Sequence, residues 1–170
     1  KGEDGRQRIK RIAEQIKYEN RDKSFDCVIG LSGGVDSTYA AVKAVELGLR
    51  PLAVTLDNGW NTEIANANVQ NLVACLGLPL RTVTLNWPEF SDLQRSFLYA
   101  STPDCEIPSD HAIVSLLHQV VEEEGLKYLV TGRNIRTETH IPEAWSMGHS
   151  DWKYIKSVHD RFGTIPLATY

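Results

Sequence analysis

The residues most able to do chemistry form one short loop: Ser32, Gly33, Gly34, Val35, Asp36 and Ser37. An apolar run at 25–31, typical of a buried strand, precedes the loop, and a helical pattern at 38–47 follows it. The two glycines can adopt backbone angles that other residues avoid, and they carry no side chain to keep a ligand away. Their N–H groups, with those at the start of the helix, favour a nest for phosphate or pyrophosphate.

The polar side chains of this loop narrow its chemistry. Ser32 and Ser37 can each donate a hydroxyl group. Asp36 would repel phosphate, so its presence indicates that it either holds Mg²⁺ or caps N–H groups of the loop. No Gly-Lys-Ser/Thr follows, and the loop is not Gly-x-Gly-x-x-Gly, so it is neither a Walker A nor a dinucleotide loop. A simple tight turn is the alternative, but the strand–loop–helix context favours anion binding.

The elements that must position this loop alternate along the chain. Further strands are predicted at 51–56, 80–85 and 127–131, and helices at 63–76, 88–99 and 151–162. Another helix is expected to begin with Ser109 as its cap and to end at Gly125. This order predicts an α/β fold, a doubly wound parallel sheet with helices on both faces, spanning 25–170 after a helical lead-in at 1–24. The strand at 127–131 should flank the first strand, and ligands should bind at the carboxyl ends.

Composition excludes several classes of protein. The 170 residues are 42% hydrophobic and 24% charged, and the formal net charge of −4 argues against broad nucleic-acid binding. No apolar run could span a membrane. Three widely spaced cysteines, with Cys27 and Cys75 expected in the core, fit a reducing cytoplasm. The chain begins with Lys1, which suggests a piece of a longer protein, and homo-oligomer formation is left open.

Two further groups of candidates follow strands. Asp57, after the second strand, could contact adenosine or a metal, although an Asp-Asn-Gly turn explains it equally well. After the fourth strand, Gly132 permits close approach of a phosphate and Asn134 can bond to it. Arg133 could neutralise the charge that develops on pyrophosphate or on a substrate diphosphate, and a polar strand exit is the alternative.

The remaining candidates lie in the segments that flank the fourth strand. Asp110 and His111 should begin a helix, where His111 could act as a general acid/base or contact sugar hydroxyls. Cys105 suggests sulfur transfer, but a small buried residue or a pocket role is favoured. Glu138 and Trp145 fall in a long polar loop that could bind a sugar, and Trp145 could equally belong to the core.

The loop Ser-Gly-Gly-Val-Asp-Ser resembles the pyrophosphate loop of the N-type ATP pyrophosphatases, or PP-loop ATPases, which include GMP and NAD synthetases. The resemblance implies an adenine nucleotide alpha hydrolase-like fold and cleavage of ATP, with Mg²⁺, between the α- and β-phosphates. A substrate oxygen is then adenylylated, and a nitrogen or sulfur nucleophile displaces AMP. It also implies that backbone groups near Leu56 read the adenine edge.

Three later segments are similar to the N-acetyl sugar amidotransferases of lipopolysaccharide and flagellin-glycan biosynthesis. They are 103–112, 131–138 and a run that contains Pro142, Trp145, Gly148, Asp151, Lys156, His159, Phe162 and Gly163. The resemblance implies a nucleotide-linked N-acetyl sugar as substrate, with ammonia supplied by glutaminase and ammonia-channelling synthase-like subunits. Family members also carry a cysteine-rich segment before the first strand and more chain after the last helix. On this interpretation Asp36, Arg133 and His111 are catalytic.

Two other functions compete with this one. A tRNA-thiolating enzyme of the same fold would want paired cysteines and a basic surface, and the sequence has neither. A non-catalytic nucleotide-binding module would not need Ser32, Asp36 and Ser37 together. The sequence therefore predicts an ATP-cleaving amidotransferase that acts on a nucleotide-linked sugar.

Overall fold

The computed structural model describes residues 2–133 and 148–168. The chain divides into two compact units. The sheet unit contains Lys1–Thr55, Asn61–Val83 and Leu117–Arg133, and the helical unit contains Leu56–Trp60, Thr84–Leu116 and Asn134–Tyr170. Within the described ranges, no helix has the length and apolar character needed to cross a membrane.

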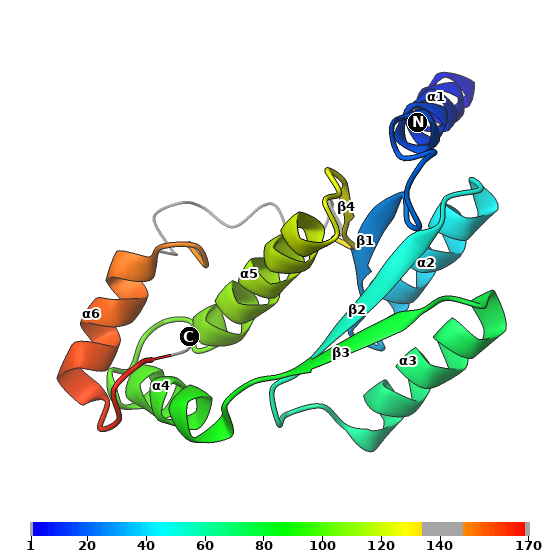
Figure 1. Ribbon diagram of the computed structural model, residues 1–170. Helices are drawn as coiled ribbons and strands as arrows, with labels where there is room; N and C mark the ends of the chain where they lie inside the picture. Colours follow the sequence, from blue (N-terminus) through cyan, green and yellow to red (C-terminus); the bar gives the residue numbers. More distant parts are fainter. Residues whose placement is uncertain (1, 134–147, 169–170) are drawn as a thin grey trace. The chain divides into compact units, whose positions relative to one another are not determined.

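Four strands form one sheet, as the alternating pattern predicts. They are β1 (Cys27–Gly30), β2 (Pro51–Asp57), β3 (Leu80–Thr84) and β4 (Leu129–Val130). Their order is β3-β2-β1-β4, and β1 runs parallel to both β2 and β4 (Figure 1). The α/β fold with a parallel sheet is therefore confirmed, as is the place of the fourth strand beside the first. The chain changes direction across the sheet between β1 and β4, which is where ligands bind in such folds.

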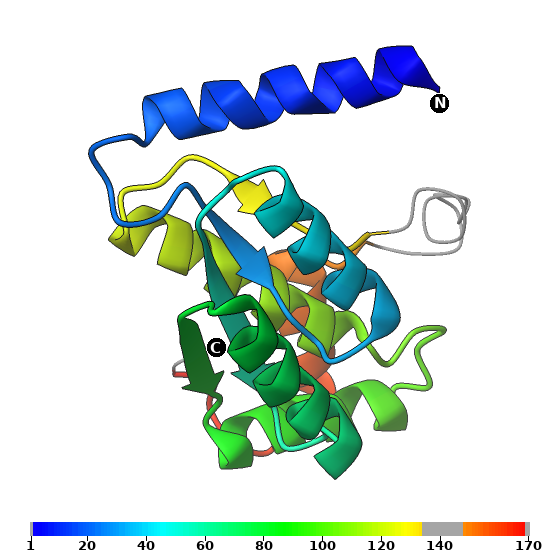
Figure 2. The same ribbon diagram turned by 90° about the vertical axis from the view of Figure 1, so that its right-hand side faces the viewer.

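Helices cover both faces of this sheet because successive side chains of β1 point to opposite sides. On one face, Ile29 packs with Ala41 of α2 (Val35–Glu46) and Val73 of α3 (Glu63–Leu76). On the other face, Gly30 meets the side chain of Leu117 of α5 (Ile107–Glu123). Figure 2 shows α2 and α3 in front of the strands, with α5 behind them.

The predicted helix boundaries hold best where local capping decides them. The Thr62 side chain accepts a hydrogen bond from Ala65 N at 3.1 Å, and Gly77 ends α3 in the left-handed conformation at φ 63°. Both features are readable from the sequence, so the predicted range 63–76 is confirmed. The prediction for α2 began three residues late, because Gly34 takes the extended N-cap conformation and the helix starts at Val35.

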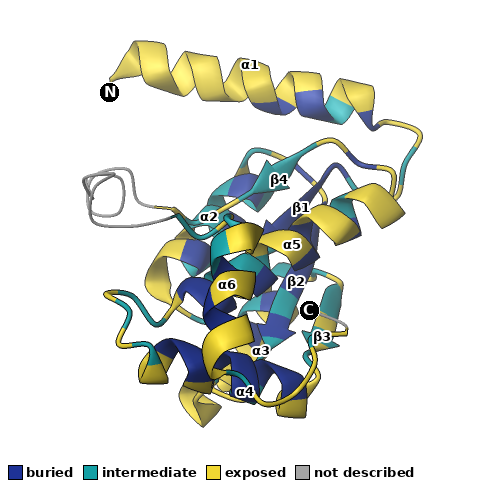
Figure 3. Ribbon diagram, turned by 90° about the vertical axis from the view of Figure 1, so that its left-hand side faces the viewer, coloured by how far each residue is buried: buried dark blue, intermediate teal, exposed yellow. Residues whose placement is uncertain are grey.

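The first helix, α1 (Glu3–Glu19), packs against the rest of the sheet unit through one end. Ala13 and Ile16 are buried together with Cys27 and Ala44. Most of the rest of α1, including Ile9, is exposed (Figure 3). The lead-in segment therefore packs through its last turns.

The cysteines divide between core and surface. Cys27 is fully buried, and burial, followed by the negative charge of Asp26, raises the pKa of its thiol to about 12. Cys27 is thus a core residue, as predicted, and its thiolate is strongly disfavoured. The prediction that Cys75 belongs to the core is wrong, because its side chain lies on the exposed side of α3.

The helical unit has its own core between α4 (Trp87–Tyr99), the beginning of α5 and α6 (Trp152–Phe162). Its buried apolar residues are Leu93, Phe97, Ile107, Ile155 and Val158. The prediction that Ser109 caps α5 is wrong: the helix starts at Ile107, and Ser109 is buried inside it, with Oγ 3.5 Å from Gln94 Oε1. Pro108 marked a loop in the sequence, yet proline is compatible with the first helical turn.

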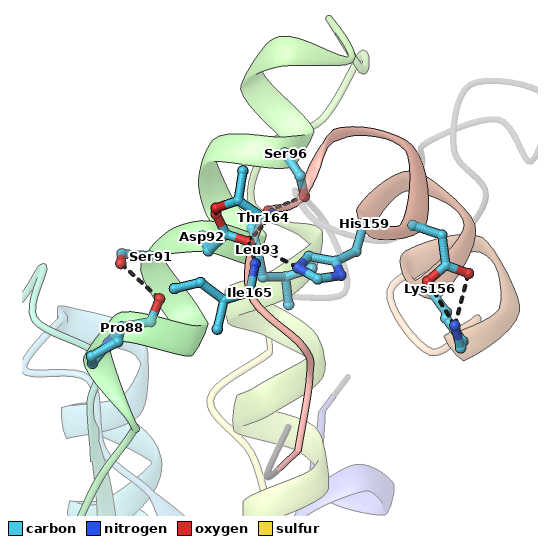
Figure 4. Close-up of polar contacts among 10 residues, drawn as sticks. Pro88, Ser91, Asp92, Leu93, Ser96, Lys156, His159, Thr164 and Ile165 are labelled. Atoms are coloured by element: carbon cyan, nitrogen blue, oxygen red, sulfur yellow. Dashed lines mark hydrogen bonds and ion pairs between the residues drawn. The ribbon is translucent and has the colours of Figure 1, made fainter.

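One buried carboxylate ties the end of the described chain to α4. Asp92, 3% exposed, accepts hydrogen bonds from Thr164 N and Oγ1, both at 2.7 Å, and from Ile165 N at 3.0 Å. The ring of His159 lies on the same carboxylate, with Nε2 3.0 Å from Oδ2 (Figure 4). His159 is therefore a buried partner of Asp92, while Lys156 is exposed and pairs with Asp160. This arrangement, called the Asp92 hub below, holds α6 and the segment after it.

Candidate phosphate site and a second polar cluster

The loop that follows β1 leads directly into α2, whose first turn takes up Val35, Asp36 and Ser37 of the predicted loop. Leu31 N donates to Val54 O at 2.8 Å, which extends the pairing with β2 to the edge of the loop. Gly33 then takes φ 76°, a conformation that favours glycine. No side chain caps the amide end of α2. That end therefore presents N–H groups and the positive end of the helix dipole beside the loop.

Hydroxyl groups organise the interior of the loop. Ser32 Oγ and Ser37 Oγ lie 3.2 Å apart, and Ser37 Oγ also donates to Gly34 O at 3.1 Å. Gly34 O further accepts from Thr38 Oγ1 at 2.8 Å. The carbonyl oxygen of Gly34 is thus engaged by the protein itself. Since the uncapped N–H groups of α2 remain at the same place, the arrangement suits an anion.

Asn68 of α3 braces the loop, and the sequence analysis missed it. Its Nδ2 donates to Gly33 O at 3.0 Å. The backbone of Gly33 also lies against α3: a Cβ on Gly33 would lie only 2.3 Å from Ala65 O. Loop and helix are 35 residues apart in sequence, so no local pattern could reveal the contact.

Gly132 brings the exit of β4 against the first turn of α2. A Cβ on Gly132 would lie 2.6 Å from Ser37 N and 2.8 Å from Asp36 C, closer than real contacts allow. The two backbones can meet only because Gly132 has no side chain. The sheet unit therefore brings together Ser32–Ser37 and Gly132, with the exposed Arg133 next in the chain.

In the ATP cleavage that the sequence predicts, a Gly132→Ala variant should lose about 10²-fold in rate, the penalty typical of a displacement of about 1 Å at a reacting group. The added methyl group must push β4 away from Ser37, which moves the amide end of α2. Steady-state release of pyrophosphate measures the effect. Gly5→Ala is the matched control, since a Cβ there meets nothing within 4 Å. Equal rates for the two variants would contradict this role of Gly132.

Asp36 fits a metal ligand of the kind that Mg²⁺ uses with nucleotides. The residue is exposed in the first turn of α2. Among the residues that the structure describes, no group of three or more His, Cys, Asp or Glu side chains is placed to hold a metal ion. Mg²⁺ commonly binds one or two carboxylates and takes its other ligands from phosphates and water. A single carboxylate beside a loop that suits an anion is consistent with magnesium binding of this kind.

The turn after β2 belongs to the helical unit and is internally bonded. Asp57 Oδ1 accepts from Gly59 N at 3.1 Å, and Asn58 Oδ1 accepts from Trp60 N at 3.0 Å. Leu56 is buried, at 8% exposure. These contacts match the turn that the sequence offered as the alternative for Asp57, and its contact with adenosine or metal stays a prediction.

A second polar cluster lies at the beginning of α5, also in the helical unit. Asp110 is in the first turn of the helix and His111 follows it; both contact His149, which the sequence analysis missed. Asp104 is the fourth member, with Oδ2 3.1 Å from His149 Nε2. Cys105, next to Asp104, is partly buried, and its carbonyl oxygen accepts from Gln94 Nε2 at 2.7 Å. The spacing of 38 residues between His111 and His149 hid this cluster from sequence patterns.

Three predicted site residues, Asn134, Glu138 and Trp145, lie outside the described residues. Their roles, like those of Arg133 and Cys105, stay predictions.

Comparison with known proteins finds similar proteins among synthases and synthetases. No family model matches the chain. It is 27% identical over 149 residues to the 7-cyano-7-deazaguanine synthase of Helicobacter pylori, covering 78% of this chain and 62% of that protein. It is 29% identical over 164 residues to the glutamine-hydrolysing GMP synthase of Pyrobaculum aerophilum, covering 93% of this chain and 30% of that protein. The chain thus spans less than two thirds of either relative.

Solved structures show the same fold. The NH₃-dependent NAD synthetase of Campylobacter jejuni superposes with a TM-score of 0.56 at 14% identity, over 91% of this chain and 72% of that one. The glutamine-dependent NAD⁺ synthetase of Acinetobacter baumannii gives 0.57 at 16% identity, over 79% and 28%. These solved structures show the fold of the chain, and the two sequence relatives support the PP-loop ATP pyrophosphatase superfamily that the loop after β1 resembles.

Proposed function

We propose that the chain is the ATP-cleaving domain of an amidotransferase that forms a C–N bond on a nucleotide-linked N-acetyl sugar. One observation supports the ATP-cleaving part of this proposal: the uncapped amide end of α2 lies beside Gly33, and Ser32 and Ser37 line the loop. The names of two similar proteins include hydrolysis of glutamine or dependence on NH₃, which favours ammonia as the nucleophile. The proposed sugar substrate depends on the resemblance of 103–112 and 131–138 to the N-acetyl sugar amidotransferases.

In this reaction the loop would hold the phosphates of ATP so that the α-phosphorus faces the acceptor. The acetamido oxygen attacks the α-phosphorus, the bond to the β-phosphate oxygen breaks, and pyrophosphate leaves. Ammonia then adds to the amide carbon of the adenylylated intermediate, loses a proton, and displaces AMP to leave an acetamidino group. The N–H groups of α2 and the side chain of Arg133 would stabilise the charge that develops on the departing pyrophosphate.

Mg²⁺ bound beside Asp36 would neutralise phosphate charge and orient the leaving group. Ammonia would come from glutaminase and ammonia-channelling synthase-like partner subunits. In vitro, an ammonium salt should replace these subunits as the source of ammonia.

The decisive experiment gives the full-length protein ATP, ammonium and a set of nucleotide-linked N-acetyl sugars. Pyrophosphate and AMP are expected, with a product in which NH replaces one oxygen atom, detected by mass spectrometry. ADP and phosphate would overturn the assignment to PP-loop chemistry. Pyrophosphate released with other amide or acid acceptors, and never with a sugar, would overturn the sugar half alone.

In the same assay, Asp36→Asn is expected to lower kcat by about 10²-fold, as loss of one charge-stabilising group does. Glu46→Gln, at the other end of α2 where Glu46 pairs with Lys43, is the control and should keep its rate. Full activity of Asp36→Asn across magnesium concentrations would exclude Asp36 as the metal ligand.

A further inference from the structure

The peptide between Gly33 and Gly34 lies directly before the hydrogen-bonded turns of α2. The next peptide is already aligned by the helix, because Gly34 O accepts from Thr38 N at 3.1 Å. Gly33 O lies outside this helical pattern and accepts from Asn68 Nδ2 of α3, at 3.0 Å. The orientation of the peptide between the two glycines therefore depends on a side chain from another helix.

The hydrogen bond from Asn68 also decides where the Gly34 N–H group points. In a trans peptide the carbonyl oxygen and the N–H group point in opposite directions. Because Asn68 holds Gly33 O toward α3, Gly34 N–H points into the loop, where Ser32 Oγ lies 3.4 Å from Gly34 N. A contact of 3.4 Å is long for a hydrogen bond, so a charged phosphate oxygen is a stronger acceptor for this N–H group.

The two glycines make such a brace necessary. A side chain at position 33 is excluded, because a Cβ on Gly33 would lie 2.3 Å from Ala65 O. Glycine, however, adopts positive and negative φ about equally well, so adjacent glycines allow the peptide between them to turn over. A reversed peptide would direct the partial negative charge of Gly33 O into the loop, where it repels phosphate. Asn68 stabilises the orientation that presents the N–H group.

We propose that Asn68 is a positioning residue for the phosphates of ATP: by holding Gly33 O, it directs Gly34 N–H into the loop and adds one donor to those of α2. This inference rests on the proposed function, in which the loop binds ATP. Loop and brace both belong to the sheet unit, since residues 1–55 and 61–83 lie in it. Asn68 acts through the peptide and touches no reacting atom.

Residual dipolar couplings of the ¹⁵N-labelled full-length protein report the direction of the Gly34 N–H bond without any assay of activity. In wild type, the coupling should match an N–H group that points toward Ser32. In Asn68→Leu, which keeps a side chain of similar size and loses the donor, it should become the average of two orientations. Asn71→Leu, the same change at another exposed position of α3, is the control and should keep the wild-type value. An unchanged Gly34 coupling in Asn68→Leu would overturn the inference.

Calorimetric titrations with inorganic pyrophosphate, magnesium ATP and adenosine test the effect on binding. Asn68→Leu should bind the two phosphate ligands about fivefold more weakly, the scale of one neutral hydrogen bond, and should bind adenosine as wild type does. In Asn68→His, the ring Nδ1 is as many bonds from Cα as the amide nitrogen is, so its N–H group should restore the affinity. An equal loss for adenosine, or affinities of Asn68→Leu that match those of Asn71→Leu, would exclude the positioning role.

The proposed function fails in a different way. In that case wild type would release no pyrophosphate from ATP with any acceptor, whatever the direction of the Gly34 N–H bond. The dipolar couplings of wild type and Asn68→Leu would still decide whether Asn68 orients the peptide. With the proposed function intact, KM for ATP in Asn68→Leu should rise about fivefold, as binding of ATP weakens, and KM for ammonium should stay that of wild type.

Discussion

A Gly33→Ala variant is expected to lose at least about 10²-fold in pyrophosphate release, the scale reached when a reacting group is displaced by about 1 Å. The added Cβ would lie 2.3 Å from Ala65 O, a backbone atom of α3 that cannot rotate away. The left-handed φ of 76° adds roughly 1–2 kcal/mol of strain for a residue with a side chain. Movement of the loop would relieve both the clash with Ala65 and the backbone strain. A loop that has moved no longer presents its N–H groups to phosphate.

A matched variant separates backbone strain from the contact. Gly77 also has a positive φ, at 63°, but a Cβ there meets nothing within 4 Å. Gly77→Ala should therefore reduce the midpoint of thermal unfolding and leave turnover near that of wild type. Calorimetric titration with ATP should show weaker binding for Gly33→Ala alone. If both variants turn over equally, the close approach of loop and α3 is not what shapes the phosphate site.

The loop after β1 and the sheet that carries it could be predicted because their signals are local. The β-branched run before Ser32 and the paired glycines indicate a strand that ends in a tight loop. In the same way, Thr62 indicates the start of α3 and Gly77 indicates its end. The alternation of strands and helices then leaves few topologies, which is why the flanking position of β4 was also correct.

The residues that sequence analysis missed act over long separations. Asn68 reaches Gly33 across 35 residues, and His149 reaches Asp104 across 45. Neither residue type is distinctive on its own, since asparagine and histidine are common on exposed helices and turns. The prediction that Cys75 is buried was wrong for a related reason. Helical periodicity places a residue on a helix, but packing against the sheet decides which side of the helix is buried.

The Asp92 hub is expected to contribute more to stability than any other single polar group described above. Asp92→Asn keeps the size of the side chain and loses its charge, and its amide nitrogen cannot accept from Thr164, Ile165 or His159. Leaving buried partners of a charged group unpaired costs about 3 kcal/mol. Urea unfolding should show a midpoint shifted down accordingly. Asp160→Asn, which breaks an exposed pair with Lys156 on α6, should change the midpoint little.

The contribution of Asp92 should also depend on pH in a defined direction. Burial opposes ionisation of this carboxyl, but hydrogen bonds from Thr164, Ile165 and His159 outweigh it and hold its pKa well below the usual value. The folded state therefore binds a proton at Asp92 less readily than the unfolded state, and the stabilisation is fully present above about pH 4, the ordinary pKa of aspartate. It falls as the pH drops below that value, so wild type and Asp92→Asn should converge in stability under acid conditions. A difference that stays constant down to about pH 2, far below that ordinary value, would show that Asp92 stabilises the hub through packing, with no part played by its charge.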